Sequence, residues 1–274
     1  MAQYPPTREA GSMSTSASAD RSLTELTHGG RVVGRFHRFD AKPPVAELFV
    51  PEGHLDHVVD AVFTDLAGWS LTTTDDDLAD ALVRRGATPT RHFSLMSVEL
   101  QSRNLTHHAS GAEFPEFPEF LEVRPLRSDG LVPPEVVQLV RSAYPEGHPD
   151  EEQGADDDII RDIQRAQSGG RLGPLMDQSA LFFDADRLAA MLLVNRVPGP
   201  PPLGGPWVTD VCRAPDPRYA GLGRSVLLRL MRLLHADGEP ALSLAVTEGN
   251  PARGVYESLG FTVVATTLKV HVPQ

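Results

Sequence analysis

Arg218-Tyr219-Ala220-Gly221-Leu222-Gly223-Arg224-Ser225 is the stretch from which the fold can be read, because its two near-adjacent glycines open a strongly apolar helix. The first N–H groups of a helix have no intrahelical acceptor, and the helix dipole adds about half a positive charge at that end. Glycine lets a phosphate approach this backbone closely. The stretch therefore predicts an anion-binding loop.

The segments on either side predict the order strand, glycine loop, helix. Trp207 to Cys212 is typical of a strand that ends near Pro215, and apolar residues recur at helical spacing from Leu222 to Leu234. A dinucleotide fingerprint needs a small residue where Val226 stands, and a P-loop needs Gly-Lys-Ser/Thr after the loop. Neither familiar phosphate loop fits.

A second strand and a short helix follow. Residues 241–246 form an apolar run, Asn250 is a candidate N-cap, and Pro251 suits the first helical position. Tyr256 lies within this helix, which ends near Gly260, and residues 261–270 alternate as a final strand.

With these elements in place, the chain resembles the GNAT superfamily of N-acetyltransferases. Residues 218–223 match the family's Arg/Gln-x-x-Gly-x-Gly/Ala cofactor loop, and Asn250-Pro251-Ala252-Arg253 with Tyr256 and Gly260-Phe261 lie at family spacing. The resemblance covers residues 118–274 and implies an α/β (α+β) fold with a mixed, largely antiparallel sheet flanked by helices. It places the other elements at 120–127 (strand), 134–143 and 156–167 (helices), and 180–184 with 187–196 (hairpin).

Two positions depart from the family pattern. Arg213 stands where an apolar strand residue is usual, and Tyr219 stands where a small residue is common. Both changes would alter the binding cleft without abolishing cofactor binding.

The resemblance implies acetyl-CoA as the co-substrate. Backbone N–H groups from about Tyr219 to Ser225 would hold the coenzyme A pyrophosphate, and the strand at 207–213 would hold the pantetheine arm through its backbone. The residues implied in cofactor binding are Val211, Cys212, Arg213, Arg218, Tyr219, Ala220, Gly221, Leu222, Gly223, Arg224, Ser225 and Asn250. N-capping explains Asn250 equally well, and Cys212 reads more readily as a small buried strand residue than as a nucleophile.

Two catalytic candidates follow. Tyr256 occupies the family position of the acid that protonates the departing sulfur, although its helical face also allows a purely packing role. Asp210 is a candidate general base, but its closeness to Arg213 favours a structural ion pair. A water chain could serve instead.

The N-terminal part shows a weaker version of the same pattern. Residues 1–28 are rich in Ser, Thr, Ala and Gly and predict a disordered tail. Residues 29–105 contain a helix at 54–66, a strand at 69–73, a helix from Asp75 to Arg85 and a strand at 92–100, so we expect a degenerate GNAT-like subdomain. It has no paired-glycine loop and is expected to bind no cofactor.

Residues 106–117, with the repeated Glu-Phe-Pro, are expected to link this subdomain to the catalytic domain at 118–274. Docking of the phenylalanines on a domain surface is an equally good interpretation.

Composition limits the class of protein. The net charge of −12 argues against nonspecific binding to nucleic acid or a membrane surface, since both need a cationic face. One cysteine excludes an intramolecular disulfide framework, and the histidines show no metal-ligand spacing, so no metal is expected. We expect a cytoplasmic protein, either monomer or homodimer.

The sequence therefore predicts an acetyl-CoA-dependent N-acetyltransferase that acts on a primary amine of a small molecule or protein by direct attack in a ternary complex. The alternative is a noncatalytic acyl-CoA-binding or partner-binding module. A longer acyl group or a hydroxyl acceptor also stays open. Acceptor choice is expected to lie in segment 144–178 and in the loop Pro198–Pro206, both irregular and rich in glycine or proline. The acidic residues between 146 and 158 suit either a cationic amine or a solvated face.

Overall fold

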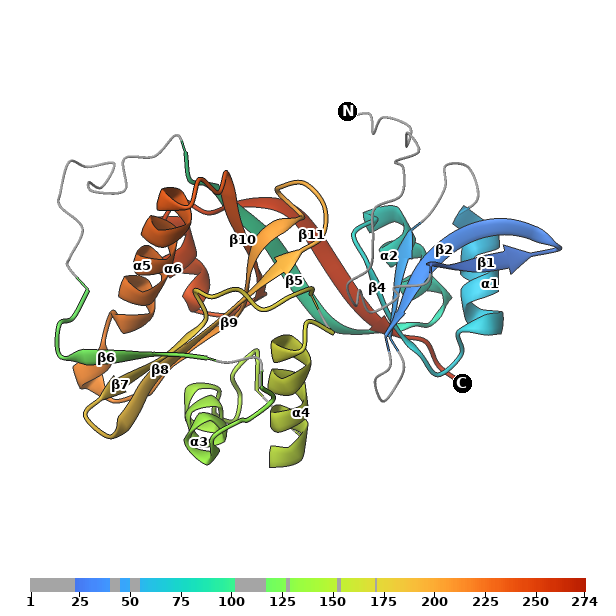
Figure 1. Cartoon of the computed structure of the whole chain (residues 1–274). Helices are drawn as coiled ribbons and strands as arrows, with labels where there is room; N and C mark the ends of the chain where they lie inside the picture. The colour runs from blue at the N-terminus through green and yellow to red at the C-terminus, as the bar shows by residue number, and fades with distance from the viewer. Residues whose placement is uncertain are drawn as a thin grey trace.

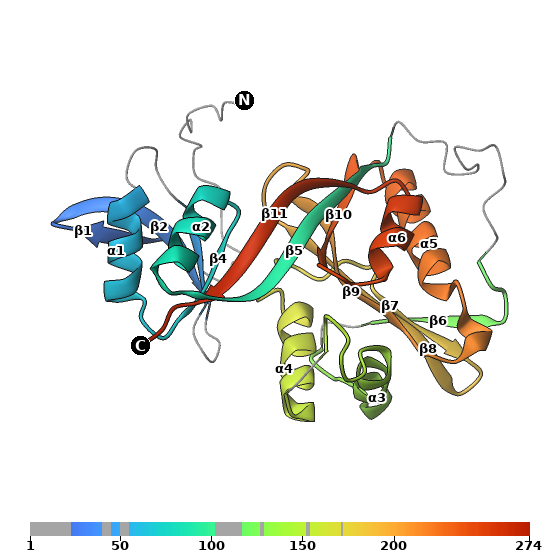
Figure 2. The same cartoon turned by 180° about the vertical axis from the view of Figure 1, so that it is seen from behind.

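The structure, a computed structural model, describes residues 23–39, 45–49, 55–101, 117–126, 129–151, 154–170 and 172–274. Within these residues, eleven strands form one sheet in the order β1-β2-β3-β4-β11-β5-β10-β9-β8-β7-β6. Figures 1 and 2 show that the molecule has two lobes, joined by the long strands β5 and β11.

The strands are β1 (Leu23–His28), β2 (Arg31–Phe39), β3 (Val45–Phe49), β4 (Ser70–Thr73), β5 (Thr88–Glu99), β6 (Leu121–Pro125), β7 (Ala180–Asp184), β8 (Arg187–Val197), β9 (Gly205–Arg213), β10 (Ala241–Thr247) and β11 (Thr262–His271). The helices are α1 (Leu55–Asp65), α2 (Asp76–Arg85), α3 (Pro134–Ala143), α4 (Asp156–Gln167), the short 3-10 helix η1 (Pro217–Tyr219), α5 (Leu222–Ala236) and α6 (Ala252–Ser258).

The two lobes share one topology. In the N-terminal lobe the hairpin β1–β2 precedes β3-α1-β4-α2-β5, and in the C-terminal lobe the hairpin β7–β8 precedes β9-α5-β10-α6-β11. The corresponding pairs β3–β4 and β9–β10 are both parallel. This correspondence agrees with the expected degenerate copy.

The lobes exchange their last strands. Strand β5 leaves the N-terminal lobe and pairs antiparallel with β10, whereas β11 leaves the C-terminal lobe and pairs antiparallel with β4. The two exchanged strands also pair with each other from Ser97↔Thr262 to Thr88↔His271. The expected units 29–105 and 118–274 are therefore interlocked.

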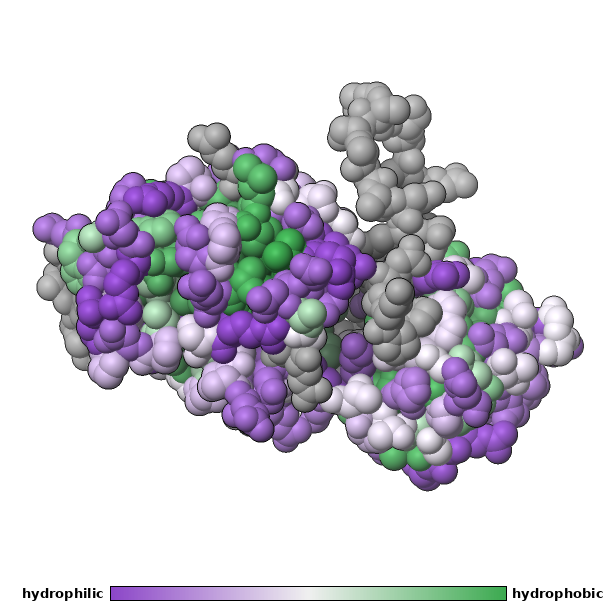
Figure 3. All heavy atoms as spheres, turned by 90° about the horizontal axis from the view of Figure 1, so that it is seen from below, coloured by the Kyte–Doolittle hydropathy of each residue, from purple (hydrophilic) through white to green (hydrophobic). Residues whose placement is uncertain are grey.

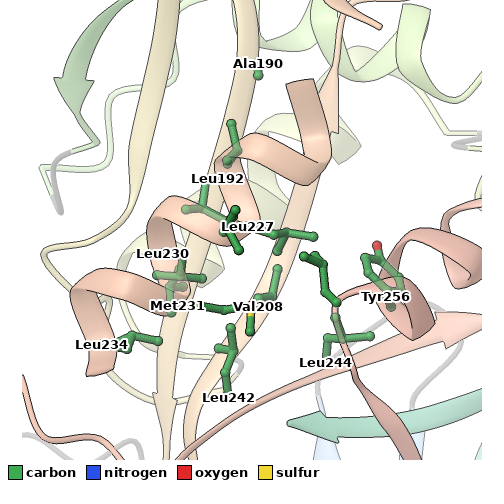
Figure 4. Close-up of a cluster of buried hydrophobic side chains, with 14 of the residues drawn as sticks. Ala190, Leu192, Val208, Leu227, Leu230, Met231, Leu234, Leu242, Leu244 and Tyr256 are labelled. Atoms are coloured by element: carbon green, nitrogen blue, oxygen red, sulfur yellow. The ribbon is translucent and has the colours of Figure 1, made fainter. Parts of the chain in front are cut away.

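Three apolar clusters hold this sheet in place. In the C-terminal lobe, α5 and α6 cover one face of the sheet, and α3 and α4 cover the other (Figure 1). The buried side chains under α5 and α6, among them Leu227, Leu230 and Met231, form the α5-side cluster. Those under α3 and α4, among them Val136, Ile159 and Leu193, form the α3-side cluster. Figure 4 shows the α5 side, where Leu227, Leu230 and Met231 pack on side chains of β8, β9 and β10. In the N-terminal lobe, α1 and α2 pack on the sheet over a third cluster. Seen from below, hydrophilic residues surround a hydrophobic area on the C-terminal lobe (Figure 3).

Local sequence explains where several helices begin and end. Asp75 Oδ1 accepts a hydrogen bond from the Leu78 N–H at 2.9 Å and caps α2, which ends at Gly86 in the left-handed conformation. Pro134 occupies the first turn of α3, where its missing N–H costs nothing.

The structure corrects one expectation for the N-terminal part and adds elements that were not predicted. Residues 23–28 belong to strand β1 rather than to a disordered tail, and residues 1–22 lie outside the described residues. The β1–β2 hairpin and β3 were not predicted.

Most of the expected linker, residues 106–116, also lies outside the described residues. Its last residue, Phe117, packs against the α5-side cluster, with its ring 5.6 Å from that of Phe182 and the Arg229 guanidinium 5.7 Å away. For this residue the docking interpretation is confirmed.

Candidate active site

Strands β9 and β10 separate at the point where the site begins. Their parallel pairing covers only Ser243↔Trp207 and Leu244↔Val208, whereas β9 stays paired with β8 as far as Arg213. A β-bulge leaves Thr209 unmatched between Val208 and Asp210, and bulges bend the strand that carries them. The backbone edge of Asp210 to Arg213 therefore leaves the ladder with β10 and is placed to pair with an extended ligand.

The glycine loop provides the open space that the sequence predicts. Gly221 caps α5 with a φ of 80°, a left-handed conformation that favours glycine. A Cβ added at Gly221 or Gly223 would meet nothing within 4 Å. Because packing within the described protein does not require glycine at 223, close approach of a ligand explains it better.

The loop also narrows the expected set of phosphate donors. The Tyr219 and Ala220 N–H groups donate to Asp216 O and Pro217 O, both at 3.0 Å, and the Ser225 N–H donates to Gly221 O at 3.1 Å. Because these three N–H groups already donate within the protein, the backbone N–H groups best placed to bind a phosphate are those from Gly221 to Gly223 at the start of α5.

Tyr219 anchors the loop to the rest of the sheet. Its ring is buried, and its hydroxyl donates to Asp184 Oδ2 at 2.9 Å at the end of β7. Burial and this carboxylate raise the pKa of Tyr219. The departure from the family pattern thus has a structural role, since it ties the loop to the β7–β8 hairpin.

The arginine side chains beside the loop already make contacts with other groups of the protein. Arg218 donates to Asp184 Oδ2 and to Asp216 Oδ2, each at 3.2 Å. Arg224 Nε lies 3.4 Å from Ser258 Oγ on α6, and Arg213 Nη1 donates to Ala214 O at 2.8 Å. The backbone, more than these side chains, is placed to hold an anion.

Tyr256 lies at the edge of the apolar cluster, and its hydroxyl oxygen points away from that cluster (Figure 4). Burial raises the pKa of Tyr256 most, and the negative charges of Asp210 and Asp150 raise it further. The phenol therefore stays protonated near neutral pH and can donate a hydrogen bond.

Asp210 lies on β9, on the face of the sheet that α3 covers. Its partner Leu193 belongs to the α3-side cluster, and Tyr144, just after α3, donates to Asp210 Oδ1 at 2.8 Å. This hydrogen bond is one contact of the carboxylate, and no ion pair between Asp210 and Arg213 is seen among the described residues. Burial, followed by the charge of Asp210, holds the pKa of Tyr144 well above its usual range.

The sequence did not single out Tyr144 as a site residue. The chain has four tyrosines, and three of them, at 144, 219 and 256, border this site. The small number of tyrosines in the chain is the sequence signal that could have pointed to Tyr144.

A second carboxylate, Asp150, joins the loop after α3 to the end of β10. Asp150 accepts hydrogen bonds from Thr247 Oγ1 and, at 2.6 Å, from Asn250 Nδ2. The Asn250 Oδ1 atom accepts from the Ala252 N–H at 2.7 Å and so satisfies a donor at the start of α6, although the N-cap position itself falls on Pro251, one residue later than predicted.

Cys212 has no nucleophilic character here. It is buried in the α3-side cluster, and burial raises the pKa of its thiol well above the usual range. A backbone role for Val211 to Arg213 toward a cofactor stays a prediction.

The described residues contain no group of three or more His, Cys, Asp or Glu side chains that could hold a metal ion. None of their helices is long and apolar enough to cross a membrane.

Comparisons with known proteins agree with this geometry. The FR47-like protein family model matches residues 206–270, which hold β9, the glycine loop, α5, β10, α6 and most of β11. No curated protein sequence matches the chain significantly.

Several solved structures have a similar fold over most of the chain. A GCN5-related N-acetyltransferase from Sphaerobacter thermophilus has 13% identity and a TM-score of 0.56, with 89% of this chain and 78% of that chain covered. A tandem GNAT protein from the clavulanic acid biosynthesis pathway has 17% identity and a TM-score of 0.54, with 89% and 80% covered. A GCN5-related N-acetyltransferase from Kribbella flavida has 17% identity and a TM-score of 0.52, with 93% and 91% covered. The chain therefore has the fold of the GCN5-related N-acetyltransferases, in a tandem-like arrangement whose C-terminal lobe carries the glycine loop.

Proposed function

We propose that the protein is an acyl-CoA-dependent N-acetyltransferase that moves an acetyl group from acetyl-CoA to a primary amine. One observation carries the proposal: β9 leaves β10 after Val208, beside a helix N-terminus where both Gly221 and Gly223 face open space. A backbone edge for an extended arm and a cradle for a pyrophosphate thus lie next to each other.

The residues present fit such a co-substrate. The N–H groups of Gly221 to Gly223 would hold the pyrophosphate, and the edge of β9 from Asp210 to Arg213 would bind the pantetheine amides. The thioester supplies the acetyl group and leaves as a thiol. Overall, one N–C bond forms, one C–S bond breaks, and one proton passes from nitrogen to sulfur.

Asp210 and Tyr256 divide the proton transfer between them. Asp210, on the face toward α3, takes the proton from the amine, and Tyr256 donates toward the sulfur. A phenol of ordinary pKa near 10 that protonates a thiolate near 8.5 works uphill by about 2 kcal/mol. The raised pKa of Tyr256 makes this step harder while Asp210 is charged.

Protonation of Asp210 reduces that difficulty in part, because burial remains the larger cause of the raised pKa of Tyr256. The negative charge of Asp210 is the second cause, after burial, of the raised pKa of Tyr256. Once Asp210 holds the amine proton, that charge is gone and Tyr256 becomes a stronger acid. The two groups therefore act in sequence, with the base preparing the acid.

Release of free thiol from acetyl-CoA over a panel of amines tests the proposal. We expect amine-dependent release by the wild-type protein, and Tyr256→Phe should lower kcat about tenfold or more with little change in acetyl-CoA affinity. Binding of acetyl-CoA without turnover on any amine would instead favour the alternative, a noncatalytic acyl-CoA-binding module. Equal kcat in Tyr256→Phe would remove only the acid assignment.

A further inference from the structure

A cavity of about 650 Å³ lies beside the proposed catalytic groups, where the two lobes meet. Its walls come from β5 (Thr90 to His92), from the end of β10 (Thr247 and Glu248), and from the loop after α3 (His148, Pro149 and Glu151). The exchanged strand β5 is thus the contribution of the N-terminal lobe to this cavity. Its volume suits a small molecule.

Asp150 connects the cavity to the catalytic centre. It stands between two lining residues, Pro149 and Glu151, and it accepts a hydrogen bond from a third, Thr247. A second link is His148, another lining residue, whose ring lies 5.2 Å from that of Tyr144, and the Tyr144 hydroxyl donates to Asp210. A ligand in the cavity therefore lies close to the proposed base.

The charges around the cavity are mainly negative. Arg91 is the one guanidinium among the described lining residues, and its Nη1 atom lies 3.8 Å from Asp150 Oδ1. Two carboxylates line the cavity itself. Glu151 Oε2 accepts from the Gly147 N–H at 2.8 Å, and Glu248 Oε2 lies 2.7 Å from His92 Nδ1. Among the described residues, these two glutamates and the adjacent Asp150 outnumber the one guanidinium, and the imidazoles of His92 and His148 complete the polar lining.

We propose that this cavity binds the second, unreacted ammonium group of a diamine acceptor, with Glu151 and Glu248 as its partners. This inference rests on the proposed function and names the class of acceptor. The reacting nitrogen must be neutral to attack, whereas the distal nitrogen keeps its proton and its charge. A diamine satisfies both requirements in one molecule, with one end toward Asp210 and the other against the two glutamates.

A set of four-carbon probes tests the charge requirement. Butane-1,4-diamine, butylamine and 4-aminobutyrate carry the same reacting amine with a distal cation, no distal charge and a distal anion. We expect kcat/KM for the diamine to exceed that for butylamine about fivefold or more, with 4-aminobutyrate the poorest of the three. Equal values for diamine and butylamine, or a preference for 4-aminobutyrate through Arg91, would overturn the proposal.

A double variant and a matched control distinguish the effect of the cavity carboxylates from a general effect of removing surface charge. In the double variant Glu151→Gln and Glu248→Gln the preference for the diamine should disappear, while the rate with butylamine changes little. Glu122→Gln is the matched control, because Glu122 is a surface carboxylate paired with Arg124 on the distant edge strand β6. It should leave the preference intact.

Calorimetry with the diamine alone provides a readout that needs no turnover. Wild-type protein should bind butane-1,4-diamine more tightly than butylamine, and the double variant should lose this difference. If the protein binds the diamine but not acetyl-CoA, the proposed acetyl transfer is wrong, whereas diamine binding in the cavity is supported. If it acetylates amines without preferring the diamine, only the present inference fails.

Discussion

The Tyr144 hydroxyl donates a hydrogen bond to Asp210 Oδ1 at 2.8 Å and so joins the end of α3 to the centre of β9. The same hydroxyl lies 3.4 Å from Val211 O, on the strand that leaves β10 two residues earlier than Asp210. The loop after α3, which borders the acceptor cavity, is therefore tied to the proposed base.

Tyr144→Phe should shift the pH dependence of the reaction. A carboxylate that loses a hydrogen-bond donor binds protons more tightly, so the acid limb of the kcat/KM profile should move to higher pH. Asp210→Asn should instead lower kcat by about 100-fold or more at every pH. An unchanged profile in Tyr144→Phe would show that Tyr144 does not act through the base.

Tyr219→Phe tests the anchor of the glycine loop. Loss of the hydrogen bond to Asp184 should lower the free energy of unfolding by about 1–2 kcal/mol and weaken acetyl-CoA binding, because the loop is held less firmly. Asp184→Asn should weaken binding in the same direction. The measurements are urea unfolding and calorimetry, and full affinity in both variants would contradict a positioning role for this contact.

The elements of the C-terminal lobe follow the expected order. The helices at 134–143 and 156–167, which the family resemblance implies, have the expected bounds. Their apolar period, the proline at the start of α3 and the acidic first turn of α4 account for them locally. The hairpin β7–β8 and strands β9 to β11 also follow the expected ranges to within a few residues.

The features that the sequence could not predict depend on distant partners. The sequence does not reveal the strand exchange, because the alternation of apolar and polar residues in β5 and β11 is the same whichever lobe the strands join. The contact between Tyr144 and Asp210 joins residues 66 positions apart, and helical periodicity alone says nothing about it. In the N-terminal lobe, β1 pairs with β2 in a hairpin, but most residues of β1 are exposed and several are polar, so in composition this strand resembles a tail.

Stability should fall at alkaline pH. The pKa values of Cys212, Tyr144 and Tyr256 are all raised in the folded protein, so above about pH 9 the unfolded chain loses protons that the folded chain keeps. Fewer bound protons in the unfolded state mean that the free energy of unfolding decreases as pH rises. Each group contributes up to about 1.4 kcal/mol per pH unit once its unfolded form ionises.

Urea unfolding between pH 7 and 10.5 measures this slope. Cys212→Ala should remove the part that begins near pH 9 and leave the steeper tyrosine part above pH 10. Constant stability across this range in the wild-type protein would show that the burial of these groups is not maintained in solution.

Cleavage of the linker tests the exchange of strands. A protease site placed within residues 106–116 would separate the chain into two pieces, and these should still elute together, because β5 lies between β10 and β11. Residues 118–274 expressed alone should fold poorly, since both β10 and β11 lose a ladder partner. Separation of the two pieces without denaturant would contradict the interlocked sheet.

The central claim is that the loop at Gly221 and Gly223 binds the pyrophosphate of coenzyme A, and the most direct test is calorimetry of acetyl-CoA binding to Gly223→Ala. Beyond its chain neighbours and its own helix, a Cβ at this position meets no atom of the described residues within 4 Å. Alanine favours a helix by about 1 kcal/mol over glycine, so the variant should melt at a higher temperature. It should nevertheless bind acetyl-CoA about tenfold or more weakly, because the methyl group keeps the phosphate from the backbone donors. A more stable protein with weakened binding is the predicted result. Unchanged affinity in Gly223→Ala, or no binding by the wild-type protein, would contradict the account.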